Sequence, residues 1–444
     1  MTPIKLSDHF TYRKLFRFTL PSILMMIFTS IYSMVDGFFV SNYTGKTAFA
    51  AINLIYPYIG ILGAFGFMIG TGGAAVVGRM LGQQQREEAN RTFSMFVWAS
   101  VISGILFVIV GLATVRPVAK LLGATPDMMD DCVLYGSIVL CGTPFFMLQF
   151  MFQIFFSTAE KPKLGLVDTL AAGCTNMVLD WLFVGVFRLE LVGAASATVI
   201  SQMVGGLFPI FYFARKNTSL LRLVKPSFSM RTLLKACGNG SSEFLSNIAM
   251  SIVGMLFNLQ LIKYYGENGV AAYGVIMYVS FIFAAIFIGY SMGSAPIVSY
   301  HFGADNRDEL KNLFGKSMRL IPTIGAVMTV LAFVAAGPLA YAFVSYDKGL
   351  YDLTVYAMRI FSLSFLLSGI NSYGSGFFTA LNNGLVSAII SFARTFVFQI
   401  TTILLMPLII GPDGIWWAMI ACEVLSLAVT AFFLIKNRKK YGYA

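Results

Sequence analysis

The sequence is poor in charged residues. Asp, Glu, Lys and Arg make up 11% of its 444 residues, whereas 57% are hydrophobic, and its mean hydropathy is +0.77. Soluble domains carry about 25% charged residues. The composition therefore excludes an ordinary soluble protein and indicates one that crosses a membrane many times.

Residues that carry enzymatic or metal chemistry are also scarce. The chain has two histidines and five cysteines, and no two cysteines have the CxxC spacing. It contains no phosphate-binding loop of the GxxxxGK[ST] type, which counts against direct use of ATP. Because no nucleophile–base set stands out either, we expect neither an enzyme nor a bound cofactor.

Long apolar runs, in contrast, fill the chain. Each is long enough to cross a hydrocarbon core of about 30 Å at about 1.5 Å per residue. The expected fold is therefore an all-α polytopic membrane protein with twelve transmembrane helices. The runs lie at about 16–40, 50–78, 93–115, 132–157, 163–187, 191–214, 233–263, 270–298, 314–343, 352–380, 385–410 and 415–435.

The positive charges are unevenly distributed between the segments that join these runs. If both termini are cytoplasmic, 23 of the 31 Lys and Arg residues lie in cytoplasmic segments and six in outer loops. Because cytoplasmic segments are enriched in positive charge, we expect a multi-pass plasma-membrane protein with both termini in the cytoplasm. Topology and anionic membrane lipid account for the net charge of +11, so no nucleic-acid partner is expected.

The two halves of the chain repeat each other. One constant shift in numbering, called the repeat shift below, carries Gly45 onto Gly266, and likewise Gly82 onto Gly303 and Gly193 onto Gly414. It holds from the first run of each half to the last, and six runs per half make the repeats parallel. We expect an N-terminal lobe at 1–220 and a C-terminal lobe at 221–444, related by pseudo-two-fold symmetry, V-shaped with a central cleft.

Polar side chains interrupt the runs of the first half in a pattern that the second half lacks. Asp36 lies in the first run, Asn176 and Asp180 lie one turn apart in the fifth, and Thr198 lies in the sixth. Counted by helical rise, Asp36, Asp180 and Thr198 all fall in the outer half of the membrane and can meet. Their partners in the second half are Phe257, Val397, Thr401 and Met419.

Three interpretations of this polar group stay open. Two carboxylates, an amide and a hydroxyl offer oxygen ligands suited to a hard cation such as Na⁺. Alternatively, two close carboxylates in a low dielectric share a proton. The third interpretation is that Asp180 only bonds Thr198 or Asn176 and holds two helices together, although ionisable residues inside a membrane are functional candidates by default.

Around these residues the sequence resembles the multidrug and toxic compound extrusion (MATE) family, over essentially the whole chain. The resemblance implies a cation-coupled antiporter that exports amphipathic, often cationic drugs or toxic compounds by alternating access, driven by Na⁺ or H⁺. The segments that carry it are Tyr32–Gly37, Asn53–Pro57, Asn176–Asp180 and Gly193–Thr198.

The resemblance also implies roles for single residues. Family members with a cation site in the N-terminal lobe take ligands from the first, fifth and sixth helices. The matching positions here are Asp36, Asn176, Asp180 and Thr198, with Ala194 as a backbone-carbonyl ligand. Pro21 matches a first-helix proline associated with bending of that helix, and a tolerated kink without a role in transport is its alternative.

In the second half this sequence departs from the family pattern. Other members place acidic residues in the seventh and tenth helices, whereas this chain has Glu243 and Asn371 there. A second cation site is therefore not expected. Glu243 has three open roles: attraction of a cationic substrate, proton relay, or a bond to a neighbouring helix. Glu423 is similarly open.

Candidates for the substrate cleft are polar or amphipathic residues within the apolar runs, and each has helix packing as its alternative role. Flexible thioethers and aromatic faces suit variable apolar cations. The candidates are Tyr32, Asn53, Tyr56, Gln149, Gln153, Met177, Gln202 and Glu243.

The leading expectation is drug export, by a protein that works as a monomer. Two other functions remain as alternatives. One is a flippase or exporter of a lipid-linked saccharide or related lipid. A diphosphate would need several cations in the cleft, and Arg359 and Arg394 are the arginines within the runs, which argues against it. The other is a receptor or scaffold that transports nothing, and the doubled bundle argues against that.

Overall fold

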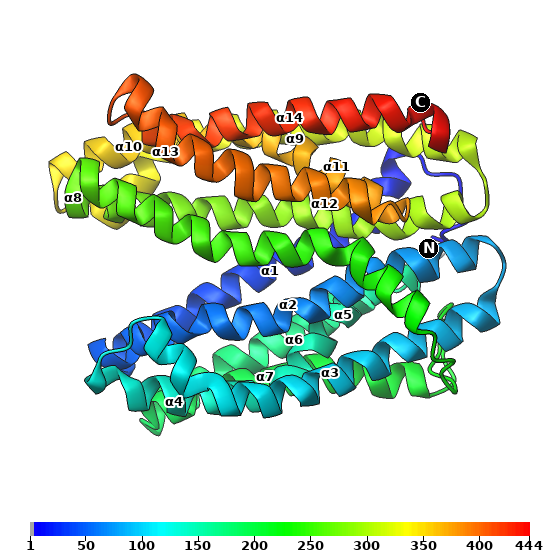
Figure 1. Ribbon diagram of the computed structural model, residues 1–444, viewed down its shortest axis with the longest axis horizontal. Helices are drawn as coiled ribbons and strands as arrows, with labels where there is room; N and C mark the ends of the chain where they lie inside the picture. The colour runs from blue at the N-terminus through cyan, green and yellow to red at the C-terminus, as the bar shows by residue number, and fades with distance from the viewer. Residues whose placement is uncertain (1–3) are drawn as a thin grey trace.

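The computed structural model describes residues 4–444, and they fold into helices joined by short turns, without a strand in that range (Figure 1). Elements of the first half are α1 (Tyr12–Tyr43), α2 (Lys46–Gly82), α3 (Arg86–Leu121), α4 (Pro126–Cys141), α5 (Thr143–Thr158), α6 (Pro162–Asp180), the π-helix η1 (Trp181–Val186) and α7 (Glu190–Ala214). Those of the second half are α8 (Met230–Gly303), α9 (Arg307–Val344), α10 (Lys348–Ser362), α11 (Phe365–Ala380), α12 (Gly384–Phe392), the π-helix η2 (Ala393–Phe398), α13 (Gln399–Ile410) and α14 (Gly414–Tyr441).

These helices supply the expected crossings. Within residues 4–444, nine helical segments are long and apolar enough to span a membrane, and the bent pairs α4–α5 (53°) and α10–α11 (45°) add two more. The 74 residues of α8 would extend about 110 Å as one straight helix. Instead its two arms run in opposite directions on either side of Gly266, where φ is 62° (Figure 1). Counting both arms confirms the all-α polytopic fold with twelve crossings.

The repeat shift also relates the turns of the two halves. Positive φ angles, which favour glycine, occur at both members of three pairs. The same shift carries Arg86, where α3 begins, onto Arg307, where α9 begins. Figure 1 shows α2–α7 stacked on one side of the molecule and α9–α14 on the other. The exact lobe boundary, after position 220, stays a prediction. The three pairs of turn residues with positive φ are Gly45 and Gly266, Gln84 and Asp305, and Glu190 and Gly411.

Glycines let the two halves meet backbone to backbone at the end where both termini lie. A Cβ atom on Gly82 would stand 2.0 Å from the carbonyl oxygen of Tyr300, and one on Gly240 would stand 2.0 Å from that of Met68. No side chain fits at such distances. Helices α2 and α8 are therefore in direct backbone contact at both points.

The segment before α1 ties the two halves together at the same end. Leu6 and Phe10 are completely buried, although they precede the first crossing. The Leu6 amide donates to Glu160 Oε1 at 2.6 Å, in the loop between α5 and α6. The Phe10 amide donates to Glu309 Oε1 at 2.9 Å, in the first turn of α9, and His9 Nδ1 lies 2.6 Å from Glu309 Oε2.

Removing the Phe10 ring is expected to destabilise the protein. Phe10 is 0% exposed, and truncation of a buried Phe to Ala costs about 3–5 kcal/mol. Phe10→Ala should therefore melt at a clearly lower temperature than the parent when the purified protein is heated in detergent. Phe16→Ala is the matched control, since Phe16 is 50% exposed on α1. Equal melting temperatures for the two variants would contradict this role.

Candidate cation site

The polar residues predicted from the sequence converge where α1, α6 and α7 meet. Asn176 and Asp180 lie one turn apart at the end of α6, and Asp180 is completely buried. Asp36 comes from α1, which packs against both α6 and η1. The carboxyl groups of Asp36 and Asp180 lie against each other. The predicted convergence of these side chains is therefore present in the fold.

Four oxygen atoms of this group have no hydrogen-bond donor among the described residues. Asp36 Oδ1, Asn176 Oδ1 and both carboxylate oxygens of Asp180 are buried without a hydrogen-bond partner among residues 4–444. An unsatisfied buried polar atom costs about 1–3 kcal/mol. Because every one of these atoms is an acceptor, the missing partner is a cation, a proton or a water. These oxygen atoms can thus act as ligands of a hard metal cation or share a proton.

Thr198 lies on the α7 side of this site. Its hydroxyl donates to the carbonyl oxygen of Ala194 at 3.0 Å, so the Ala194 carbonyl already has a partner and the Thr198 lone pairs stay available. Tyr135 of α4, 3% exposed, lies against the Thr198 side chain. Tyr135 was not among the residues predicted from the sequence.

The backbone changes its helical type directly after Asp180. Residues Trp181–Val186 form η1, and the Phe187 amide donates to Leu182 at 2.8 Å, five residues earlier. Single π-helical turns inside α-helices are frequent at functional sites. The widened turn ends the α-helix at the residue that completes the acidic pair.

Pro21 is buried inside α1, whose helix continues through it.

The predicted cleft residues fall into separate groups. Tyr32 and Tyr56 lie near Asp36, and Tyr32 also lies against Gln149. Asn53 is exposed and donates to Phe49 of its own helix at 2.9 Å. Met177 is half-buried beside Asn176. The acidic pair is therefore lined on one side by tyrosines.

The remaining candidates lie deeper between the helices. Gln149, Gln153 and Gln202 are 5%, 1% and 6% exposed. The Gln202 amide packs at Gly142, where α4 and α5 meet at their bend. Glu243 lines a cavity of about 30 Å³ between α2, α5, α8 and α11, enough for a water.

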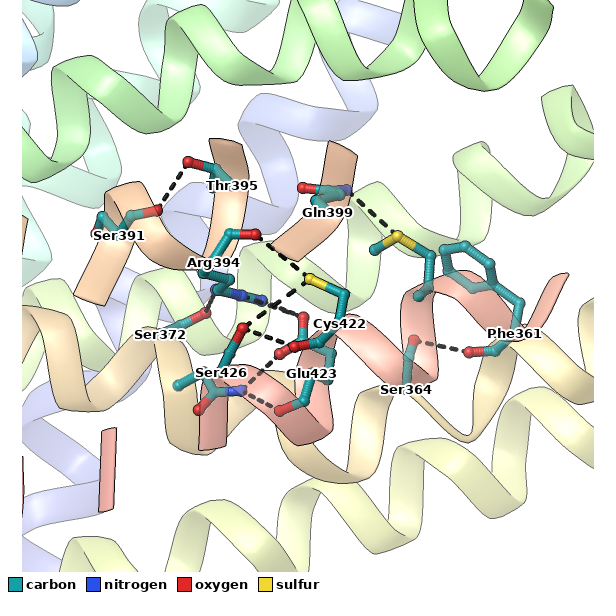
Figure 2. A network of polar contacts seen from close by, with 12 residues as sticks. Phe361, Ser364, Ser372, Ser391, Arg394, Thr395, Gln399, Cys422, Glu423 and Ser426 are labelled. Atoms are coloured by element: carbon teal, nitrogen blue, oxygen red, sulfur yellow. Dashed lines mark hydrogen bonds and ion pairs between the residues drawn. The ribbon is translucent and has the colours of Figure 1, made fainter. Parts of the chain in front are cut away.

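The second half has a polar network of its own, centred on a guanidinium group (Figure 2). Arg394 donates to Glu423 Oε1 through Nη2 at 2.5 Å and Nε at 3.1 Å, and to Ser372 Oγ at 2.9 Å. Asn371 donates to Glu423 Oε2 at 2.7 Å. Glu423 therefore has a built-in positive partner, unlike Asp36 and Asp180.

Replacing one partner of this ion pair is expected to destabilise the protein more than replacing both partners with apolar residues. Glu423 is 2% exposed, and a buried charge stripped of its partner costs about 3–5 kcal/mol. Arg394→Met should lower the melting temperature in detergent, and the double variant Arg394→Met/Glu423→Leu should recover most of the loss. A double variant no more stable than Arg394→Met would rule out the unpaired charge as the cause.

A family model described as MatE matches this chain twice, at residues 21–182 and 244–405. The chain belongs to the MatE family. It is thus a membrane transporter of the multidrug-efflux kind and not an enzyme, as the sequence predicted.

Curated relatives match nearly the whole length of this MatE chain. It is 26% identical to the multidrug export protein MepA of Staphylococcus haemolyticus, over 96% of this chain and 94% of that protein. It is 24% identical to MepA of Staphylococcus aureus strain MRSA252, with the same coverage.

Solved structures agree on the fold. A MATE transporter in complex with MaL6 superposes with a TM-score of 0.90 at 20% identity, covering 97% of both chains. The outward-facing conformation of a multidrug resistance MATE family transporter gives 0.90 at 21% identity, covering 97% of this chain and 96% of that one.

Proposed function

We propose that this MatE protein exports small amphipathic, often cationic compounds in exchange for Na⁺ or H⁺ entering the cell. The observation that supports this most is the Asp36–Asp180 pair, in which Asp36 Oδ1 and both Asp180 oxygens are buried without a hydrogen-bond partner in the part of the chain that the structure describes. Such a group binds a cation or proton readily, and it lies beside Tyr32 and Tyr56, whose faces attract organic cations.

Coupling follows from competition for this negative charge. With the pair ionised, a cationic drug beside Tyr32 and Tyr56 is attracted to it. When a cation or proton from outside binds Asp36 and Asp180, that attraction is lost and the drug is released outward. Coupling requires the pair to bind the ion differently in the two conformations. Pro21, in the first third of α1, permits the bending that such a difference needs.

We further propose that residues 1–220 and 221–444 move as two lobes in the plasma membrane, with both termini in the cytoplasm. The glycine contacts between α2 and α8 would then close the cytoplasmic end, which makes this conformation outward-facing. The likeness to a transporter solved outward-facing supports this assignment. Because one chain supplies every residue of the site, a monomer suffices.

Transport of a lipid-linked saccharide is the second candidate. Arg359 is exposed and lies 5.1 Å over the Phe333 ring, while Arg394 is paired with Glu423. Of the two, only Arg359 is left without an anionic partner among residues 4–444, whereas a diphosphate would need several cations. This favours export of the drug.

Reconstituted vesicles test the proposal directly. The purified protein should move a cationic dye against its gradient when a Na⁺ or a proton gradient is imposed separately, and one of the two should suffice. Dye movement no faster than in protein-free vesicles under both gradients would overturn the proposal. Translocation of a lipid-linked saccharide in the same vesicles would favour the second candidate.

A further inference from the structure

One buried carboxylate has no part in the site described so far. Asp168 lies on α6 and is 2% exposed, and neither of its carboxylate oxygens has a hydrogen-bond partner among residues 4–444. It comes six residues after Pro162, where α6 begins, or about 9 Å along the helix. It therefore lies toward the end of the molecule that carries the termini, away from Asp36 and Asp180.

Asp168 shares one face of α6 with the acidic pair. Residues four apart lie on the same side of a helix, and Asp168, Ala172, Asn176 and Asp180 follow that spacing. All of them are buried. Asp168 is about 12 Å from Asn176 by helical rise. The face that carries the cation site thus continues toward the cytoplasmic end and carries a second carboxylate.

A file of polar side chains on the neighbouring helices leads from the acidic pair toward Asp168. Tyr32 lies near Asp36 and against Gln149, and Gln153 follows Gln149 by one turn of α5. Gln153 Nε2 then donates to Thr169 Oγ1 at 3.4 Å, and Thr169 adjoins Asp168.

The amide oxygen of Gln153 is itself buried without a partner. The file therefore offers an unused hydrogen-bond acceptor at Gln153, and such groups are the partners that buried waters need.

The second half of the chain shows that the architecture does not require this file. The repeat shift leads from each polar member to an apolar residue or glycine. A second set of helices with the same turns thus folds without it. The residues at the shifted positions of Tyr32, Gln149, Gln153, Asp168 and Thr169 are Val253, Ile370, Gly374, Ile389 and Ile390.

Little charge surrounds Asp168. Helices α1, α5 and α7 pack against α6, and α5 carries no ionisable side chain. No hydrogen bond joins Asp168 to any ionisable side chain on these elements within residues 4–444. Those side chains are Tyr12, Arg13, Lys14, Arg17, Tyr32, Asp36 and Tyr43 on α1, Lys163, Cys174 and Asp180 on α6, and Glu190 and Tyr212 on α7.

We infer that the coupling ion is a proton, and that Asp168 receives it from the Asp36–Asp180 pair and releases it to the cytoplasm. The inference rests on the proposed antiport. A metal cation needs several oxygen ligands at each position, whereas the file offers one or two side chains per helical turn. A proton needs only a chain of hydrogen-bonded groups and waters.

The transfer balances without another reactant. An O–H bond at the acidic pair breaks, and the proton moves along water held by Tyr32, Gln149, Gln153 and Thr169. An O–H bond forms at the Asp168 carboxylate, which later gives the same proton to cytoplasmic water. Both carboxylate positions then regain their starting charge for the next cycle.

Asp168→Asn tests the inference by separating ion release from ion binding. In vesicles with a pH gradient, dye efflux by this variant should fall at least about tenfold. Displacement of bound dye by acidification, measured at equilibrium in detergent, should stay as in the parent. Asp168→Glu keeps the acid and should restore efflux, and exposed Asp352→Asn should change neither readout.

Several outcomes would overturn it. These are parental efflux rates in Asp168→Asn, joint loss of efflux and of acid-induced displacement, or a parent driven by Na⁺ but not by a pH gradient. A parent driven by neither gradient would overturn the proposed antiport as well. If Asp168→Asn does not fold, Asp168→Glu decides: its pH–rate profile should shift while its dye affinity stays, and an unchanged profile would contradict the inference.

Discussion

Asp180→Asn should abolish gradient-driven dye efflux while leaving a folded protein. The substitution keeps the size of the side chain but removes the group that is buried at 0% exposure without a partner. An amide can neither take up a proton nor supply anionic charge to a metal cation. Asp36→Asn should have the same effect, because its carboxyl lies against that of Asp180.

The pair should also behave as one unit. The effects of substituting two residues in direct contact do not simply add. The double variant should therefore transport the dye no more slowly than either single variant. Asp127→Asn is the control, because it removes an exposed carboxylate from the first turn of α4. Initial rates of dye efflux in vesicles, at equal amounts of reconstituted protein, measure the effect. Parental rates in both single variants would refute the role of the pair.

Gly240→Ala should shift the protein out of the conformation seen here. Its Cβ would lie 2.0 Å from the carbonyl oxygen of Met68, so α2 and α8 would have to separate. Overpacking of this kind costs about 1–3 kcal/mol, which changes a two-state population about 5- to 150-fold. Gly238→Ala is the matched control two residues away, because its Cβ meets nothing within 4 Å.

Spin labels at Gln83 and Asp305 can follow this shift, since both positions are exposed at the closed end. The distance distribution between the labels should gain a longer component in Gly240→Ala and stay unchanged in Gly238→Ala. Dye efflux should fall in the first variant alone. Identical distributions in the two variants would show that the glycine contact does not hold this end closed.

Much of the fold could be predicted because its determinants are local. Hydrophobic runs long enough to span a bilayer predicted the crossings, and the repeat paired their turns. The bend between α4 and α5 was not predicted. The run from 132 to 157 carries no charged side chain, and Gly142 and Pro144 break it inside that stretch. The burial of Leu6 and Phe10 was also missed, because the segment is too short to give an apolar run.

Residues of the candidate site could be predicted where the two halves of the sequence carry different residues at matching positions. Asp36, Asn176, Asp180 and Thr198 stood out because the second half has other residues there. Tyr135 did not, since the repeat shift pairs it with another tyrosine, Tyr356.

Asp168 did carry this signal, because Ile389 replaces it in the second half. What the sequence could not supply is the contact between Gln153 and Thr169, which brings the polar file next to Asp168. Side-chain contacts between helices depend on helix rotation, which hydropathy does not specify.

The most direct test of the account is the affinity for a cationic dye at increasing concentrations of the coupling ion, in the parent and in Asp36→Asn/Asp180→Asn. In the parent, the dissociation constant of the dye should rise about 5- to 150-fold as the ion saturates its site, because coupling between two sites is reciprocal. In the double variant it should stay constant. A double variant whose dye affinity falls as steeply as the parent's would contradict the claim that Asp36 and Asp180 couple the ion to the drug.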